Sequence, residues 1–134
     1  MELTFPTQHD IQALSKILSD PIFTLYKILG AETVTVKGNE FDALISLGVT
    51  SIILHGTVYV GNNKVSYKFY SVGTQKGEGG VLEFDLFKEG EIRLVVEYEG
   101  RFASLVKFSL RRKIEKNMKR LDEEVRLERI KRKI

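Results

Sequence analysis

Residues 80–87, GVLEFDLF, and residues 91–99, EIRLVVEYE, decide the fold class, because apolar and polar side chains alternate along both. Successive side chains of a strand point to opposite faces, so this period indicates strands with one face on a core and the other in water. A link containing only Lys88, Glu89 and Gly90 joins them, which predicts an antiparallel pair. The apolar sets are Leu82/Phe84/Leu86 and Ile92/Leu94/Val96/Tyr98.

The same period of two extends back to residue 32. The expected strands are 32–37, 40–47, 49–60, 64–73, 80–87 and 91–99, with turns at Lys37-Gly38-Asn39, Gly61-Asn62-Asn63 and Glu89-Gly90. Most connections are short, and six consecutive strands with hairpin-length links predict an antiparallel meander.

The first 31 residues predict one strand and two short helices. Leu3-Thr4-Phe5 is a strand candidate, and Thr7 is the expected N-cap of a helix over 8–18. Asp20 is the expected cap of a second helix, which begins at Pro21 and ends at Gly30.

Residues 101–134 contain no Gly or Pro and return to a helical period. A continuous helix of this length would span roughly 50 Å, against roughly 35 Å for the domain, so part of it should project. The apolar stripe drifts after Val125, because Leu127, Ile130 and Ile134 point nearly opposite to it. Either the helix breaks near Asp122-Glu123-Glu124, or its end shows a second apolar face to a partner. The stripe itself comprises Phe102, Val106, Leu110, Ile114, Leu121 and Val125.

Composition predicts one globular domain over residues 1–134. The chain is 43% hydrophobic and 29% charged, lacks a run of membrane-spanning length, and does not begin like a signal peptide, so we expect a cytoplasmic protein. It has no cysteine and only His9 and His55, which argues against a metal or a cofactor. The chain has few thermolabile side chains and many Lys and Glu residues. This compositional bias is reported for hyperthermophile proteins.

The glycine-rich stretch 72–81, VGTQKGEGGV, invites a phosphate-binding interpretation. A phosphate loop needs its glycines before a helix and a Lys followed by Ser or Thr. Here Gly77 follows Lys76, and the next element alternates as a strand. A hairpin turn with a bulge is the better interpretation, and we expect a flexible connection here.

The order of these elements resembles the α+β helix-grip fold of the START-like superfamily, which includes birch-pollen-allergen-type proteins and the carbon monoxide dehydrogenase G-subunit family. Three local features carry the likeness: Phe5-Pro6 before the first helix, Asp20-Pro21 between the helices, and Leu29-Gly30-Ala31-Glu32 before the second strand. The last is similar to the proline-glycine-cysteine segment of the G-subunit family, without its cysteine. The likeness is nearest to a small branch from thermoacidophilic archaea.

This resemblance implies a curved seven-stranded antiparallel sheet around a long C-terminal helix, with an apolar cavity between them for a hydrophobic, lipid-like molecule. It also implies that the glycine-rich hairpin in residues 72–81 lies at the cavity entrance and serves as a lid. The alternative for the same aromatic side chains is ordinary core packing. Tyrosine hydroxyls would be sparse polar anchors in such a cavity. The expected ligand-binding residues are Phe23, Tyr26, Tyr67, Phe69, Phe84, Leu86, Leu94, Val96, Tyr98, Phe102, Val106 and Leu110.

The sequence offers no candidate catalytic residue. The sequence lacks a serine-nucleophile motif, a paired-carboxylate signature and a His-x-x-x-His spacing, and His55 is expected on the outer side of its strand. A carrier or sensor is therefore favoured over a cyclase- or aromatase-like enzyme, which would need a polar cluster inside the cavity.

The basic charge belongs to the C-terminal segment, since residues 101–134 carry 13 Lys/Arg against 5 Asp/Glu, whereas residues 1–100 carry 8 against 13. A solvated helix is one interpretation. A contact with a membrane surface or a protein partner, including a homodimer, is the second, because Leu127, Ile130 and Ile134 alternate with basic residues. Nucleic-acid binding is the least supported, because charge alone gives only nonspecific affinity.

Overall fold

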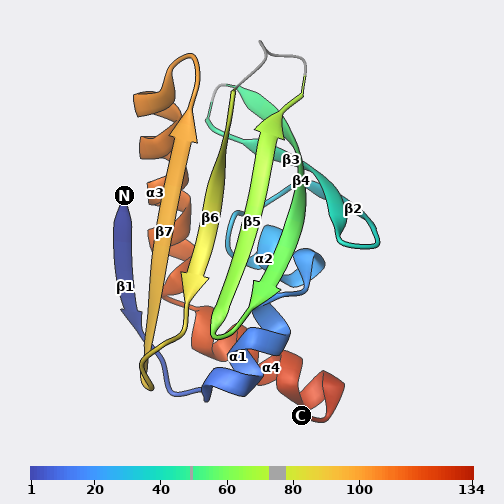
Figure 1. Cartoon of the computed structure of the whole chain (residues 1–134), viewed down its shortest axis with the longest axis vertical. Coiled ribbons are helices and arrows are strands. Elements are labelled where there is room, and N and C mark those ends of the chain that lie inside the picture. Colours follow the sequence, from blue (N-terminus) through green and yellow to red (C-terminus); the bar gives the residue numbers. More distant parts are fainter. Residues whose placement is uncertain (49, 73–77) are drawn as a thin grey trace.

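The computed structural model describes residues 1–48, 50–72 and 78–134, which form an α+β fold with one seven-stranded antiparallel sheet (Figure 1). The strand order is β1-β7-β6-β5-β4-β3-β2, so the predicted meander is confirmed and β1 is added at its far edge. The strands are β1 (Glu2–Pro6), β2 (Thr33–Lys37), β3 (Glu40–Ser46), β4 (Ser51–Gly61), β5 (Lys64–Ser71), β6 (Gly79–Asp85) and β7 (Glu91–Glu99). The helices are α1 (Ile11–Leu18), α2 (Pro21–Lys27), α3 (Ala103–Met118) and α4 (Leu121–Arg132).

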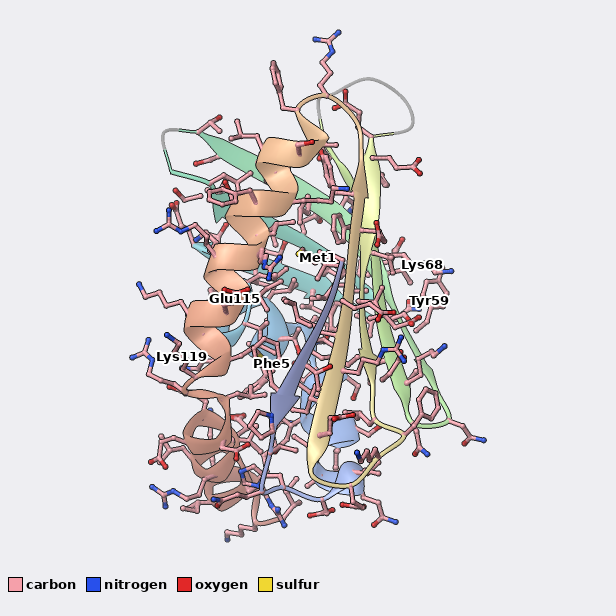
Figure 2. All side chains as sticks on the ribbon, turned by 90° about the vertical axis from the view of Figure 1, so that its left-hand side faces the viewer. Met1, Phe5, Tyr59, Lys68, Glu115 and Lys119 are labelled. Atoms are coloured by element: carbon pink, nitrogen blue, oxygen red, sulfur yellow. The ribbon has the colours of Figure 1, made fainter. Side chains whose placement is uncertain are left out.

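The molecule has two layers. Helix α3 runs along one face of the sheet, while α1 and α4 lie at its lower end and α2 lies above them, behind β4 and β5, in the view of Figure 1. Figure 2 shows Tyr59 and Lys68 on the side of the sheet that faces away from α3. The predicted inward parity is confirmed: the side chains of Val65/Tyr67/Phe69, Leu82/Phe84/Leu86 and Ile92/Leu94/Val96/Tyr98 are all buried between the layers.

A row of alternating aromatic residues and glycines crosses the middle of the sheet. Neighbours in the strand register are Phe41 on β3, Gly56 on β4, Phe69 on β5, Gly80 on β6 and Tyr98 on β7. A Cβ on Gly56 would lie 2.3 Å from the Lys68 carbonyl oxygen and 2.6 Å from the Phe41 ring, and a Cβ on Gly80 would lie 2.0 Å from the Glu97 carbonyl oxygen. The row thereby allows close approach on the inner face and ends on Tyr98.

The N-cap of α1 is Asp10, so the prediction of Thr7 as cap and of a helix from residue 8 is wrong. The Asp10 carboxylate accepts a hydrogen bond from the Ala13 backbone N–H (3.0 Å). The Thr7 hydroxyl instead donates to Asp122 Oδ1 on α4 (2.6 Å). A tertiary contact therefore uses the hydroxyl that local sequence assigned to a cap.

Helix α2 begins at Pro21 as predicted, but it ends at Lys27, before the predicted end at Gly30. Asp20 accepts from the Ile22 N–H (3.0 Å) and Pro21 occupies the first turn, where its missing donor is harmless. Gly30 follows the helix with a φ of +63°, a conformation that favours glycine.

The C-terminal segment is two helices rather than one long helix, so of the two alternatives the break is the observed one. It falls at Lys119 and Arg120, just before the acidic first turn of α4, where carboxylates favour the positive end of the helix dipole. Leu121 and Val125 are thereby buried in the core. The segment turns under α1 instead of continuing along the axis of α3 (Figure 1).

Ion pairs fix α4 against the two short helices. Arg129 bonds Asp10 (3.1 Å), Arg132 bonds Asp20, and Glu124 lies 3.2 Å from the Lys27 ammonium. These contacts compensate part of the basic charge that composition placed in this segment.

The hairpin turn and lid expected in VGTQKGEGGV fall on residues 73–77, which lie outside the described residues. On either side of them, β5 ends at Ser71 and β6 begins at Gly79.

On the outer face of the sheet, Asp85 is buried and its Oδ1 has no hydrogen-bond partner within the part of the chain that the structure describes. Burial, together with the nearby Glu83 carboxylate, raises the pKa of Asp85. A raised pKa means that the folded state favours the protonated acid, so this residue's contribution to stability falls as pH rises through that pKa.

We therefore expect Asp85→Asn to be more stable than the wild type at about pH 7 and to lose this advantage at about pH 3, where the acid is protonated. Urea unfolding of both proteins at the two pH values measures the difference. A less stable variant at neutral pH would contradict the interpretation.

Candidate functional site

A pocket of about 250 Å³ lies where the first turns of α3 meet the ends of the strands. It is at the upper end of the molecule in Figure 1, where β7 leads into α3. Apolar side chains form most of its wall. The lining residues are Leu47, Thr50, Ile52, Ser71, Glu78, Tyr98, Arg101, Phe102, Leu105, Val106 and Ser109.

The buried part of the pocket contains a pair of hydroxyl groups. Ser71 Oγ and Tyr98 OH lie 2.8 Å apart in a hydrogen bond in which either can be the donor. Both side chains are buried, and Val106 of α3 is the buried apolar wall residue. A tyrosine hydroxyl has one donor and two acceptor positions, so Tyr98 keeps capacity for a polar group of a ligand.

Glu78 lies beside the start of α3. Its carboxylate is buried, and Oε1 accepts a hydrogen bond from the Arg101 backbone N–H (3.2 Å). The amides at the start of a helix lack internal partners and carry partial positive charge, which favours a carboxylate here. Gly100, with a φ of +145°, is required because a Cβ there would lie 2.7 Å from Glu78 Cγ.

The pocket's rim is apolar and exposed. Phe102 and Leu105 line the pocket although they are 76% and 62% exposed. Phe102 is also the residue before α3, in the left-handed conformation (φ 54°) without a side-chain cap. This conformation is rare for a bulky residue and costs on the order of 1–3 kcal/mol. The chain therefore presents an aromatic ring to solvent in a conformation that local preference opposes.

The predicted ligand-binding residues fall into three groups: pocket, surface and core. Tyr98, Phe102 and Val106 line this pocket. Tyr26 is partly exposed, and its hydroxyl accepts a hydrogen bond from the Val34 N–H (3.0 Å). The other predicted residues lie in the buried core: Phe23, Tyr67, Phe69, Phe84, Leu86, Leu94, Val96 and Leu110.

The core below the pocket contains a group of packed aromatic rings. The Tyr67 ring lies 5.8 Å from that of Phe41 and 6.3 Å from that of Phe84, measured between centroids. The Tyr67 hydroxyl donates to the Leu18 carbonyl, which also accepts from the Thr24 hydroxyl (2.7 Å). Burial raises the pKa of Tyr67, so this group remains a neutral donor. Tyr67 thus has a satisfied structural role.

Sequence reasoning missed eight of the pocket's residues: Leu47, Thr50, Ile52, Ser71, Glu78, Arg101, Leu105 and Ser109. It selected inward positions in the middle of strands, whereas the pocket lies at the strand ends. The helical period offered one signal, because Leu105 and Ser109 are one turn apart beside Val106.

His55 lies on the outer face of the sheet, as expected. Its Nδ1 is 2.8 Å from Asp42 Oδ1, and its ring lies 5.3 Å from that of Tyr70. Among residues 1–48, 50–72 and 78–134, no group of His, Asp and Glu side chains could hold a metal ion. None of the described helices is both long and apolar enough to cross a bilayer.

The sheet, the helix along its inner face and the two short helices after β1 form a helix-grip fold, with the pocket at their junction. A protein-family model whose description reads "-like:-like" matches residues 1–134, and the chain belongs to that family. No curated protein sequence matches the chain.

Solved structures share this fold over nearly the whole chain. A hypothetical protein from Sulfolobus tokodaii is 28% identical, with a TM-score of 0.86, and covers 100% of this chain and 99% of its own. A START superfamily protein from Mycobacterium smegmatis is 12% identical, with a TM-score of 0.66 and coverages of 95% and 97%. Ginseng major latex-like protein 151 from Panax ginseng is 13% identical, with a TM-score of 0.61 and 94% coverage of both chains.

Proposed function

We propose that the protein binds, carries or senses a hydrophobic small molecule in the pocket between α3 and the strand ends. The single observation that carries the proposal is an apolar pocket of about 250 Å³ that contains a buried hydroxyl pair, Ser71 and Tyr98. Ligand sites combine mostly apolar walls with a few polar groups that orient the ligand. The resemblance to START-like proteins supports the same class of ligand.

The size of the pocket restricts that ligand. Drug-sized sites enclose about 300–1,000 Å³, so a pocket of about 250 Å³ fits one small apolar body or part of a single acyl chain. A hydroxyl, carbonyl or carboxyl group on the ligand could bond Tyr98, whereas a ligand without polar groups would leave that capacity unused.

Ser109→Trp is the sharpest test, because Ser109 lines the pocket from α3 and a larger side chain would fill it. We expect the variant to bind a fluorescent fatty acid at least about tenfold more weakly, which corresponds to a loss of about 1.4 kcal/mol. Fluorescence titration, with displacement by an unlabelled fatty acid, measures the affinity.

Ser104→Trp is the matched control, since Ser104 is an exposed serine of the same helix that does not line the pocket. It should bind like the wild type. Equal affinity of all three proteins would sink the proposed site, and a wild type that binds no apolar probe would sink the proposed function.

The first alternative is an enzyme of the cyclase or aromatase class, because the pocket contains polar side chains. Glu78 and Arg101 line the pocket, yet the buried Glu78 carboxylate accepts a hydrogen bond from the Arg101 N–H at the start of α3 and lies 4.0 Å from the Arg101 side chain. This bond supports a structural role for Glu78, so binding without chemistry is the better-supported function.

An adaptor acting through the C-terminal helix is the second alternative. Leu127, Ile130 and Ile134 are exposed there, beside a shallow hollow lined by His9 and Arg129. Homodimerisation, a cytoplasmic location, a thermoacidophilic archaeal origin and the narrower likeness to the carbon monoxide dehydrogenase G-subunit family are further proposals from the sequence.

A further inference from the structure

Three large apolar side chains lie exposed over the first two turns of α3. Phe102 is 76% exposed, Leu105 62% and Phe108 58%. Phe102 and Leu105 also line the pocket, so this apolar patch, defined by these three residues, is continuous with the pocket mouth. Exposed aromatic residues grouped at one end of a helix indicate an interaction surface.

The segment of the chain that carries the apolar patch is basic. Between residues 100 and 114 the chain has five basic residues, Arg101, Lys107, Arg111, Arg112 and Lys113, and no acidic residue. The Arg112 guanidinium lies over the Phe108 ring, 5.8 Å from its centroid. Of these five, Arg111 is paired along the helix with Glu115 (2.6 Å), and the Arg101 side chain lies 4.0 Å from the buried Glu78 carboxylate. Arg101, whose side chain remains 65% exposed, and Arg112 present positive charge beside exposed aromatic side chains.

We propose that the apolar patch and its basic border dock on an anionic lipid membrane surface, with the pocket mouth turned toward the lipid. Amphipathic helices bind such surfaces by inserting apolar side chains while basic residues meet anionic headgroups. The left-handed conformation at Phe102 holds its ring outward where it can insert. Docking itself is argued from the exposed side chains of the apolar patch and from its basic border. The further idea that docking serves ligand exchange rests on the proposed function.

A second copy of the chain fits this surface less well. In a two-fold dimer the same patch meets itself, so Arg101 and Arg112 of both copies would approach each other. Like charges brought together at an interface oppose association. An anionic bilayer instead complements the same residues.

The end of α4 is also the weaker membrane surface. Three of the five basic residues in 126–134 are paired with carboxylates within the protein: Arg126 with Glu123 (2.6 Å), Arg129 with Asp10 (3.1 Å) and Arg132 with Glu128 (3.0 Å). Their charge is therefore partly neutralised before any lipid arrives. We expect the start of α3, rather than residues 126–134, to be the docking surface.

Phe108→Glu tests the proposal without altering the pocket wall, because Phe108 does not line the pocket. In sedimentation with phosphatidylcholine vesicles containing roughly 30% phosphatidylglycerol, the wild type should bind and Phe108→Glu should bind at least tenfold more weakly. Arg112→Gln should lose roughly fivefold. Binding of the wild type should be much weaker on pure phosphatidylcholine.

Phe87→Glu is the matched control, because Phe87 is a 62% exposed phenylalanine that also lies near a cation, Lys64. It follows β6 at the opposite end of the sheet from the start of α3 (Figure 1). This variant should bind vesicles like the wild type. Equal loss in both phenylalanine variants would overturn the assignment of the surface.

Two further measurements separate the possible outcomes. Phe108→Glu should still bind the fluorescent fatty acid, and Ser109→Trp should still bind anionic vesicles, so failure of docking and failure of the pocket can be told apart. Sedimentation equilibrium reports the oligomeric state. A wild-type dimer that Phe108→Glu converts to a monomer, or a wild type that ignores anionic vesicles, would overturn membrane docking.

Discussion

Phe84→Ala is expected to lower the free energy of unfolding by about 3–5 kcal/mol, the range for removing a phenylalanine side chain from a packed core. Phe84 is fully buried, and its ring packs edge-on against Tyr67. The surrounding side chains cannot collapse completely into the space, so the loss combines the transfer energy of the ring with the cost of a cavity.

Chemical denaturation of Phe84→Ala against the wild type measures this effect. Phe87→Ala is the control, because Phe87 is exposed and its removal should change stability by no more than about 0.5 kcal/mol. The comparison also decides between the two sequence-based interpretations of Phe84. A loss below about 1.5 kcal/mol would mean that Phe84 already borders open space, as a cavity wall would, since a filled core costs about 3–5 kcal/mol.

Gly56→Ala is expected to destabilise the sheet by about 3 kcal/mol or more, at or above the upper end of the usual cost of overpacking. A Cβ at this position would lie 2.3 Å from the Lys68 carbonyl oxygen and 2.9 Å from Phe69 Cβ. The first contact is with backbone in the neighbouring strand, so a change of side-chain rotamer cannot relieve it. Strands β4 and β5 would have to separate or twist where they pair.

Gly61→Ala is the matched control within the same strand. Nothing lies within 4 Å of a Cβ built at Gly61. Because alanine restricts the unfolded chain, this variant should be neutral or more stable by up to about 1 kcal/mol. Thermal unfolding of both variants measures the contrast, and a Gly56→Ala protein as stable as Gly61→Ala would contradict the role of the aromatic and glycine row.

The Gly56 prediction also bears on the pocket. The row that contains Gly56 ends at Tyr98, which forms part of the buried wall beside Ser71. If the row is disturbed, Tyr98 should shift, so a folded Gly56→Ala protein should bind the fluorescent fatty acid more weakly than Gly61→Ala.

Several features of the fold could be predicted from short stretches of sequence. Alternation along residues 64–99 placed one side chain set inside because a strand has a fixed period of two. Asp20-Pro21 predicted the start of α2, and Gly30 marked the left-handed position after it, because capping and a positive φ depend on neighbouring residues. The break in the C-terminal segment was left open, although the acidic run at Asp122 is a local helix-start signal.

Local signals failed where a distant partner decides. Thr7 has the chemistry of a cap, but Asp122, 115 residues away, accepts its hydrogen bond, and Asp10 caps the helix instead. Distant partners also decide which inward side chains line the candidate site. An inward aromatic residue in the middle of a strand looks the same in sequence whether its neighbour is another ring or an open pocket.

The sequence by itself therefore determined the class of fold, the inward face of each strand and the aromatic character of the interior, because these follow from periodicity and composition. Only the tertiary structure decided that Tyr67 and Phe84 are packed core whereas Tyr98 and Phe102 border a pocket. Whether space remains beside a side chain depends on how strand ends and helix turns from distant segments meet. That packing is set by the whole chain rather than by any local pattern.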